Sequence, residues 1–201
     1  MKIGEAQQIY RDQVSSYRKQ KNVLSKQLED VRGRMKYLSG IEKEDSEKRK
    51  AYESEAATLQ LTLDALDEKQ EEYQDYLDRL ADQYCAYWNA EVEKQQKDAA
   101  KEYAADMAKL MEVARRIMKG DIVPASDEKK LMEYSEDLYQ TAKNIGALAR
   151  REKREKHDSL WDDEEKKENY DPREAAENAH AASDGPEIVD AADLAASFSS
   201  E

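Results

Sequence analysis

The chain has 201 residues, of which 39% are charged and 39% hydrophobic, and its formal net charge is −13. A compact domain normally buries a larger apolar share, so this composition favours long helices with narrow apolar stripes. No segment approaches the roughly 20 apolar residues of a transmembrane helix, so we expect no membrane-embedded part. The single cysteine, Cys85, excludes an intrachain disulfide, and a cytoplasmic location fits this usage.

Two runs of residues alternate steps of four and three, which is the spacing of coiled-coil seams. Because the first proline is Pro124, a very long helix can precede it. We predict an all-α chain with helices at about 4–39 and 47–118, joined by a turn near 40–46. The first run is Tyr10, Val14, Tyr17, Lys21, Leu24, Leu28, Val31, Met35 and Leu38, and the second is Tyr52, Ala56, Leu59, Leu63, Leu66, Gln70, Tyr73, Leu77, Leu80, Tyr84 and Tyr87.

The polar interruptions of these runs indicate how the two helices pair. In an antiparallel hairpin, residues whose numbers sum to about 90 or 91 face each other, and Lys21 then meets Gln70 in one polar layer that fixes the register. A parallel homodimer would instead place Lys21 against its own copy, which is a like-charge contact. We therefore predict an elongated antiparallel coiled-coil hairpin. The same register could also form between two chains in a swapped dimer.

A second fold-back is predicted after Gly120, which ends the long central helix. A further helix at about 127–157 returns along it, pairing residues whose numbers sum to about 248. If this pairing continues to the end of the helix, it brings aromatic and apolar residues together at the middle of the long central helix, in a cluster that we call the aromatic junction. Its predicted members are Ile3, Tyr84, Tyr87, Trp88, Leu160 and Trp161.

The charge is divided unevenly, because residues 162–201 carry a net −10 and residues 1–161 only −3. This division separates a helical body at 1–161 from an acidic tail at 162–201, which we expect to be mostly disordered. A more apolar stretch at 187–198 is a candidate for a short helix that docks on a partner or on the hairpin. Its candidate docking residues are Ile188, Val189, Leu194 and Phe198.

The residue pattern predicts no catalytic, cofactor or metal site. Cys85 has no base beside it in sequence and is expected to be an inert, at least half-buried side chain. The second fold-back would bring His157 only toward Glu91, and neither histidine pairs with a cysteine as zinc ligands do. The basic run at 150–156 is diluted by glutamates, so we expect it to pair with acidic side chains rather than with nucleic acid. No small-molecule substrate is expected.

These patterns favour a non-enzymatic structural or protein-interaction protein, a helical rod that binds partner proteins through its seams and its acidic tail and that can self-associate. In layout, residues 3–87 also resemble the helical-hairpin chaperones of bacterial flagellar and type III export systems. That resemblance implies the alternative of a small cytoplasmic adaptor or export chaperone, without assigning a role to any residue.

Overall fold

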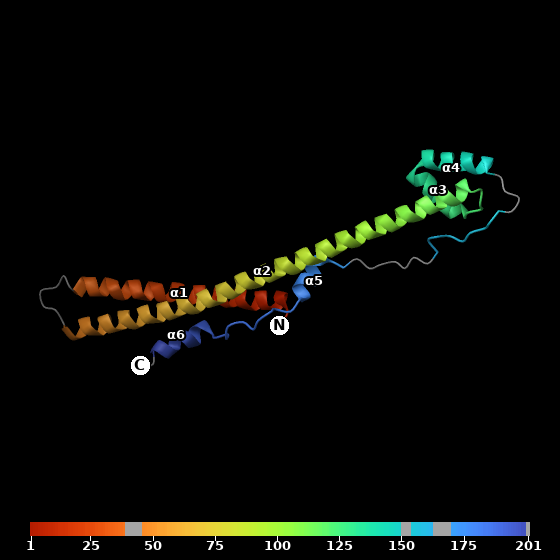
Figure 1. Cartoon of the computed structure of the whole chain (residues 1–201). Coiled ribbons are helices and arrows are strands. Elements are labelled where there is room, and N and C mark those ends of the chain that lie inside the picture. The colour runs from red at the N-terminus through yellow and green to blue at the C-terminus, as the bar shows by residue number, and fades with distance from the viewer. Residues whose placement is uncertain (39–45, 150–153, 163–169, 200–201) are drawn as a thin grey trace. The chain divides into compact units, whose positions relative to one another are not determined.

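The computed structural model describes residues 1–38, 46–149, 154–162 and 170–199, and across these residues the chain is all-α, as predicted (Figure 1). None of the helices in this described part is both long and apolar enough to cross a membrane. The predicted turn residues 39–45 lie outside the described residues. The helices are α1 (Ile3–Leu38), α2 (Ser46–Met118), α3 (Ala125–Tyr134), α4 (Glu136–Leu148), α5 (Pro172–Asn178) and α6 (Ala191–Ser199).

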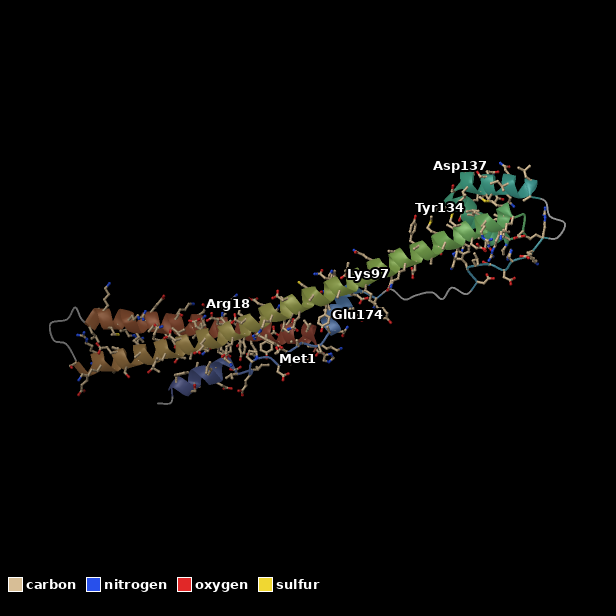
Figure 2. All side chains as sticks on the ribbon, viewed as in Figure 1. Met1, Arg18, Lys97, Tyr134, Asp137 and Glu174 are labelled. Carbon is tan, nitrogen blue, oxygen red and sulfur yellow. The ribbon has the colours of Figure 1, made fainter. Side chains whose placement is uncertain are left out.

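The chain divides into two compact units, and α2 contributes to both. The first unit contains Met1–Ala90 and Asp171–Glu201, so it joins the hairpin to the C-terminal segment. The second unit contains Glu91–Tyr170. Each unit has its own apolar cluster, and Figure 2 shows the side chains along both.

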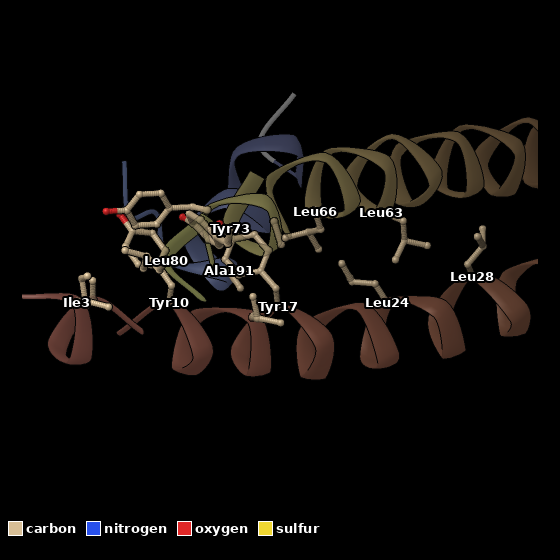
Figure 3. Packing of buried hydrophobic residues seen from close by; sticks show 14 residues of the cluster. Ile3, Tyr10, Tyr17, Leu24, Leu28, Leu63, Leu66, Tyr73, Leu80 and Ala191 are labelled. Atoms are coloured by element: carbon tan, nitrogen blue, oxygen red, sulfur yellow. The ribbon is translucent and has the colours of Figure 1, made fainter. Parts of the chain in front are cut away.

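In the first unit, α1 and the N-terminal half of α2 form the predicted antiparallel hairpin. The rings of Tyr17 and Tyr73, which the register places in one layer, lie edge to face with centroids 5.4 Å apart. Arg32 and Gln60 hydrogen-bond across the outer part of the same register at 3.2 Å. The cluster along the seam (Figure 3) includes Ile3, Tyr10, Val14, Tyr17, Leu24, Leu28, Leu63, Leu66, Tyr73, Tyr76 and Leu80.

The C-terminal segment differs from the mostly disordered tail that its composition predicts. Residues 171–199 lie against the hairpin as α5, an extended stretch and α6 (Figure 1). Asp171 caps α5 by accepting the Arg173 amide at 2.9 Å, and Pro172 occupies the first turn, where a missing N–H costs nothing. α6 confirms the short helix expected within 187–198, although it starts only at Ala191.

In the second unit, α2 ends at Met118 and Gly120 follows with φ +82°, the left-handed conformation that glycine adopts without a steric penalty. The prediction of a single helix at 127–157 is wrong, because the helix is interrupted at Ser135. This residue is extended, and its Oγ accepts the amide of Leu138 at 3.2 Å, which caps α4. The helix pattern continues through this point, but the serine supplies a local alternative partner for the backbone.

After the break, α4 turns back and its C-terminal end packs against the end of α2. A Cβ at Gly146 would overlap the carbonyl oxygen of Ile117, so only glycine permits this approach. The reversal leaves Tyr103 and Ile145, a predicted pair, largely exposed. The cluster that forms instead contains Leu110, Val113, Ala114, Ile117, Val123, Leu131 and Ala142.

Candidate functional site

Four tyrosines of the hairpin form the most distinctive polar site of the first unit. Tyr10 and Tyr17 lie on α1, Tyr73 and Tyr76 lie on α2, and each exposes 3% or less of its surface. The Tyr10 ring is held edge-on between Tyr76 and Tyr73, with centroids 4.8 and 5.5 Å away. We call these four residues the tyrosine clasp; Figure 3 labels three of them around the seam.

Each hydroxyl of the tyrosine clasp donates a hydrogen bond to a main-chain carbonyl of the C-terminal segment, and Tyr73 also accepts one from the Val189 amide at 2.9 Å. These bonds contact main chain only, so they are independent of which side chains the segment carries. The donor and acceptor pairs are Tyr76 to Ser183 at 3.0 Å, Tyr10 to Pro186 at 2.7 Å, Tyr73 to Glu187 at 3.0 Å and Tyr17 to Val189 at 2.9 Å.

The start of the C-terminal segment is fixed by the N-terminus of the chain. Lys2 and His180 pair as an antiparallel bridge, the Ile3 amide donates to the Ala179 carbonyl at 2.8 Å, and the Ala181 amide donates to the Met1 carbonyl at 3.0 Å. Main-chain bonds therefore set the register with which the segment enters the tyrosine clasp.

The end of the segment is α6, which inserts two alanines into the hairpin core. Ala191 and Ala195 are buried there, and Leu194 packs half-buried beside them. Of the other predicted docking residues, Val189 contributes its main chain, Phe198 is half-buried, and Ile188 stays 44% exposed. The segment thus docks on the hairpin, mainly through main chain and small residues.

Burial raises the pKa of the Tyr10 hydroxyl, and the neighbouring Tyr76, Tyr73 and Asp184 raise it further. Burial likewise raises the pKa of Tyr76, with Asp184 adding to the effect. Both hydroxyls therefore remain protonated donors, which is the state that the carbonyl contacts require.

The predicted polar layer of the seam is present. Lys21 Nζ donates to Gln70 Oε1 at 3.2 Å, as the register predicts. Lys21 also forms an ion pair with Asp67, which lies about one turn before Gln70 on α2. The pairing of seam positions does not predict this contact. The lysine therefore meets a neutral and a charged acceptor from the facing helix, a local arrangement consistent with the predicted register.

The predicted aromatic junction is wrong in its outer half. Ile3 is buried in the first unit with Tyr84 packed partly against the same cluster, while Tyr87 and Trp88 are exposed. Because the chain reverses at Ser135, the other two members pack in the second unit. Leu160 and Trp161 join the cluster of that unit instead.

Trp161 and Leu160 are held in the second unit by carboxylates. The Trp161 indole donates to Asp106 at 3.0 Å, and Lys130 Nζ lies 3.9 Å from the ring centre, a cation–π contact. Asp127, only 1% exposed, accepts the Leu160 amide at 3.1 Å and the Ser159 hydroxyl at 2.7 Å. A buried carboxylate thus fixes the loop at residues 159–160 against α3.

Three potential metal-binding side chains converge beside this loop. The Ile122 amide donates to the Glu155 carbonyl at 2.8 Å, and the His157 amide donates back to Ile122 at 3.0 Å. Ile122 and Lys156 are thus paired as an isolated parallel bridge. The residues on either side of a paired residue point to the same face, so Asp121, Glu155 and His157 lie together. One possible metal-ligand atom of each lies within 4.8 Å of the others. His157 therefore faces Asp121 at 3.4 Å, and its predicted approach to Glu91 is wrong.

The heptad pattern does not predict the burial of Tyr76, which is not a seam position and is covered by the C-terminal segment. Outside the clasp, the prediction that Cys85 is at least half-buried is wrong, because this side chain is exposed. The signal for the tyrosine clasp is the concentration of tyrosines at facing positions near one end of the seam, together with the Gly185-Pro186 step in the tail.

Comparison with protein-family models, with curated proteins and with solved structures gave no match.

Proposed function

We propose that this chain is a protein-interaction protein that acts by binding rather than by catalysis, and that its hairpin binds an extended polypeptide segment in the groove lined by the tyrosine clasp. In the structure the C-terminal segment of the chain occupies this groove. A partner protein would take its place, and the segment would then control access to the groove.

The observation that carries this proposal is the bonding of four buried hydroxyls to main-chain carbonyls of an extended segment. A tyrosine in a coiled-coil seam ordinarily turns its hydroxyl to water. Here all four are directed at one stretch of backbone, and recognition through main-chain hydrogen bonds is how many proteins bind extended peptides.

The charges of the segment support the same role. Asp184, Glu187 and Asp190 are exposed on the docked segment, so no acidic side chain of this stretch is buried without a partner. A basic partner can therefore reach these carboxylates while the segment is docked. The docked tail covers the tyrosine clasp and keeps its own charges outside.

The test uses a full-length variant in which residues 183–199 are replaced by a Gly-Ser sequence of the same length, which leaves the groove open. A fluorescent peptide with the sequence of residues 181–199 is expected to bind this variant, as measured by anisotropy. Changing all four clasp tyrosines to phenylalanine should weaken binding by roughly 100-fold or more, since each neutral hydrogen bond contributes on the order of 1 kcal/mol.

The matched control changes four exposed tyrosines to phenylalanine. These are Tyr37, Tyr87, Tyr103 and Tyr134. The control should leave binding of the peptide unchanged. Absence of binding to the open variant, with its helix content intact by circular dichroism, would contradict the proposal.

A further inference from the structure

Gly185 makes the closest approach between the C-terminal segment and the tyrosine clasp. A Cβ on this residue would lie under 3.0 Å from Tyr10 Oη, Tyr10 Cζ and Tyr76 Cε1. The Tyr10 ring cannot yield, because it is 3% exposed, packed against Tyr73 and Tyr76, and bonded through its hydroxyl to the Pro186 carbonyl. The groove therefore excludes every side chain at this point of the segment.

The residues that follow Gly185 keep the backbone extended without using their side chains for contact. Pro186 fixes its own φ near the extended value and has no N–H that would need a partner. The carbonyls of Pro186, Glu187 and Val189 all accept clasp hydroxyls, so the contact is made by the main chain. The side chains of Glu187 and Ile188 are exposed, so the groove does not select residues there.

A second size limit lies in α6. Ala191 and Ala195 are four residues apart, so they occupy one face of the helix, and both are buried against the hairpin cluster. Ala192 and Ala196 lie on the same helix and are exposed. The hairpin therefore restricts size at Ala191 and Ala195 and leaves Ala192 and Ala196 open.

From these contacts we infer that the groove recognises a segment with glycine followed by proline and then, after a four-residue linker, a short helix with alanine-sized residues four apart. This inference rests on the proposed function and names its ligand class. The partner is a protein that carries an exposed segment of this class. Main-chain bonds supply affinity, and the glycine and the two alanines supply selectivity.

The test uses the full chain carrying Gly185→Ala, which releases its own segment while keeping the hairpin. Four fluorescent peptides covering residues 181–199 are titrated: the natural sequence, Gly185→Ala, Ala195→Leu, and Ala196→Leu as the matched control at an exposed position. The natural and Ala196→Leu peptides are expected to bind alike. The Gly185→Ala and Ala195→Leu peptides are expected to bind at least tenfold more weakly.

Glycine-to-alanine substitution reduces the conformational freedom of a free peptide and would by itself favour binding, so a loss isolates the steric effect. Equal binding of all four peptides would overturn the inference and leave the proposed function standing. If none binds, although the natural peptide binds the Gly-Ser variant, glycine selectivity is overturned because the tail of the Gly185→Ala chain still fills the groove. Failure of the natural peptide on both full-length variants would overturn the proposed function and the inference together.

Discussion

The two units hold their outlying segments by opposite chemistry. In the first unit, four neutral hydroxyls on the hairpin donate to main-chain carbonyls of residues 183–189. In the second unit, one buried carboxylate, Asp127, accepts a main-chain amide and hydroxyls from residues 159–160 and Ser126. Each neutral hydrogen bond contributes on the order of 1 kcal/mol, whereas a buried charge that is 1% exposed loses more when its partners are removed. Under the proposed function, the first unit is the one that releases its segment.

Removal of the buried carboxylate is the strongest way to test this contrast. Asp127→Ala should destabilise the second unit by about 3 kcal/mol, because the Leu160 amide and two hydroxyls lose a shared, partly buried acceptor. Hydrogen exchange should accelerate at Leu160 and in α3, while the hairpin keeps its protection. The exposed Asp137→Ala is the control, and equal effects of the two substitutions would contradict the role given to Asp127.

A matched pair of glycines gives the next largest effect. Gly146→Ala should cost about 2 kcal/mol in urea unfolding, because its Cβ overlaps the Ile117 carbonyl oxygen and the two helices must separate. Gly33→Ala meets nothing within 4 Å in α1 and should stabilise the hairpin by about 0.5–1 kcal/mol. Stabilisation by both substitutions would show that the approach of α4 to α2 is looser than described.

The two units should also differ in how their stability responds to pH. Near neutrality neither should change, and this is the smallest of the expected effects. Hydrogen bonds from Arg115 and then Arg116 lower the pKa of Glu112 to about 2, so its contribution is complete above about pH 4.5 and is lost as pH falls toward 2. The pKa of Tyr10 is raised, so its contribution is complete below pH 10 and is lost above that value. Amide hydrogen exchange measured across pH should show loss of protection in the second unit in acid. In alkali, it should show loss of protection where the tail contacts the hairpin. The opposite assignment would contradict the comparison.

The sequence predicts these units unequally for physical reasons. The hairpin register follows from periodic apolar positions and one polar layer, Lys21 with Gln70, because a seam repeats its signal many times. The break at Ser135 depends on one side-chain cap inside a pattern whose apolar positions continue through it.

Docking of the C-terminal segment was predicted only as one alternative for residues 187–198, and its contacts through 183–189 were not predicted, for another reason. Its contacts are made by carbonyls, by Gly185 and by the two buried alanines of α6, none of which raises the apolar signal of an acidic stretch. Composition therefore predicts disorder where main-chain bonding and small residues allow close packing. The facing tyrosines were the only indication on the hairpin itself, and core packing alone could explain them.

The amide of Val189 tests the central claim most directly, because it donates to the hydroxyl of Tyr73 within the tyrosine clasp. Residue-resolved hydrogen exchange of the full chain by NMR should show this amide protected well above the rate of an unstructured peptide. The protection should fall in Tyr73→Phe and persist in Tyr87→Phe, an exposed tyrosine on the same helix. Exchange of Val189 at the unstructured rate in the unmodified chain would show that the segment does not occupy the groove, and would contradict the account.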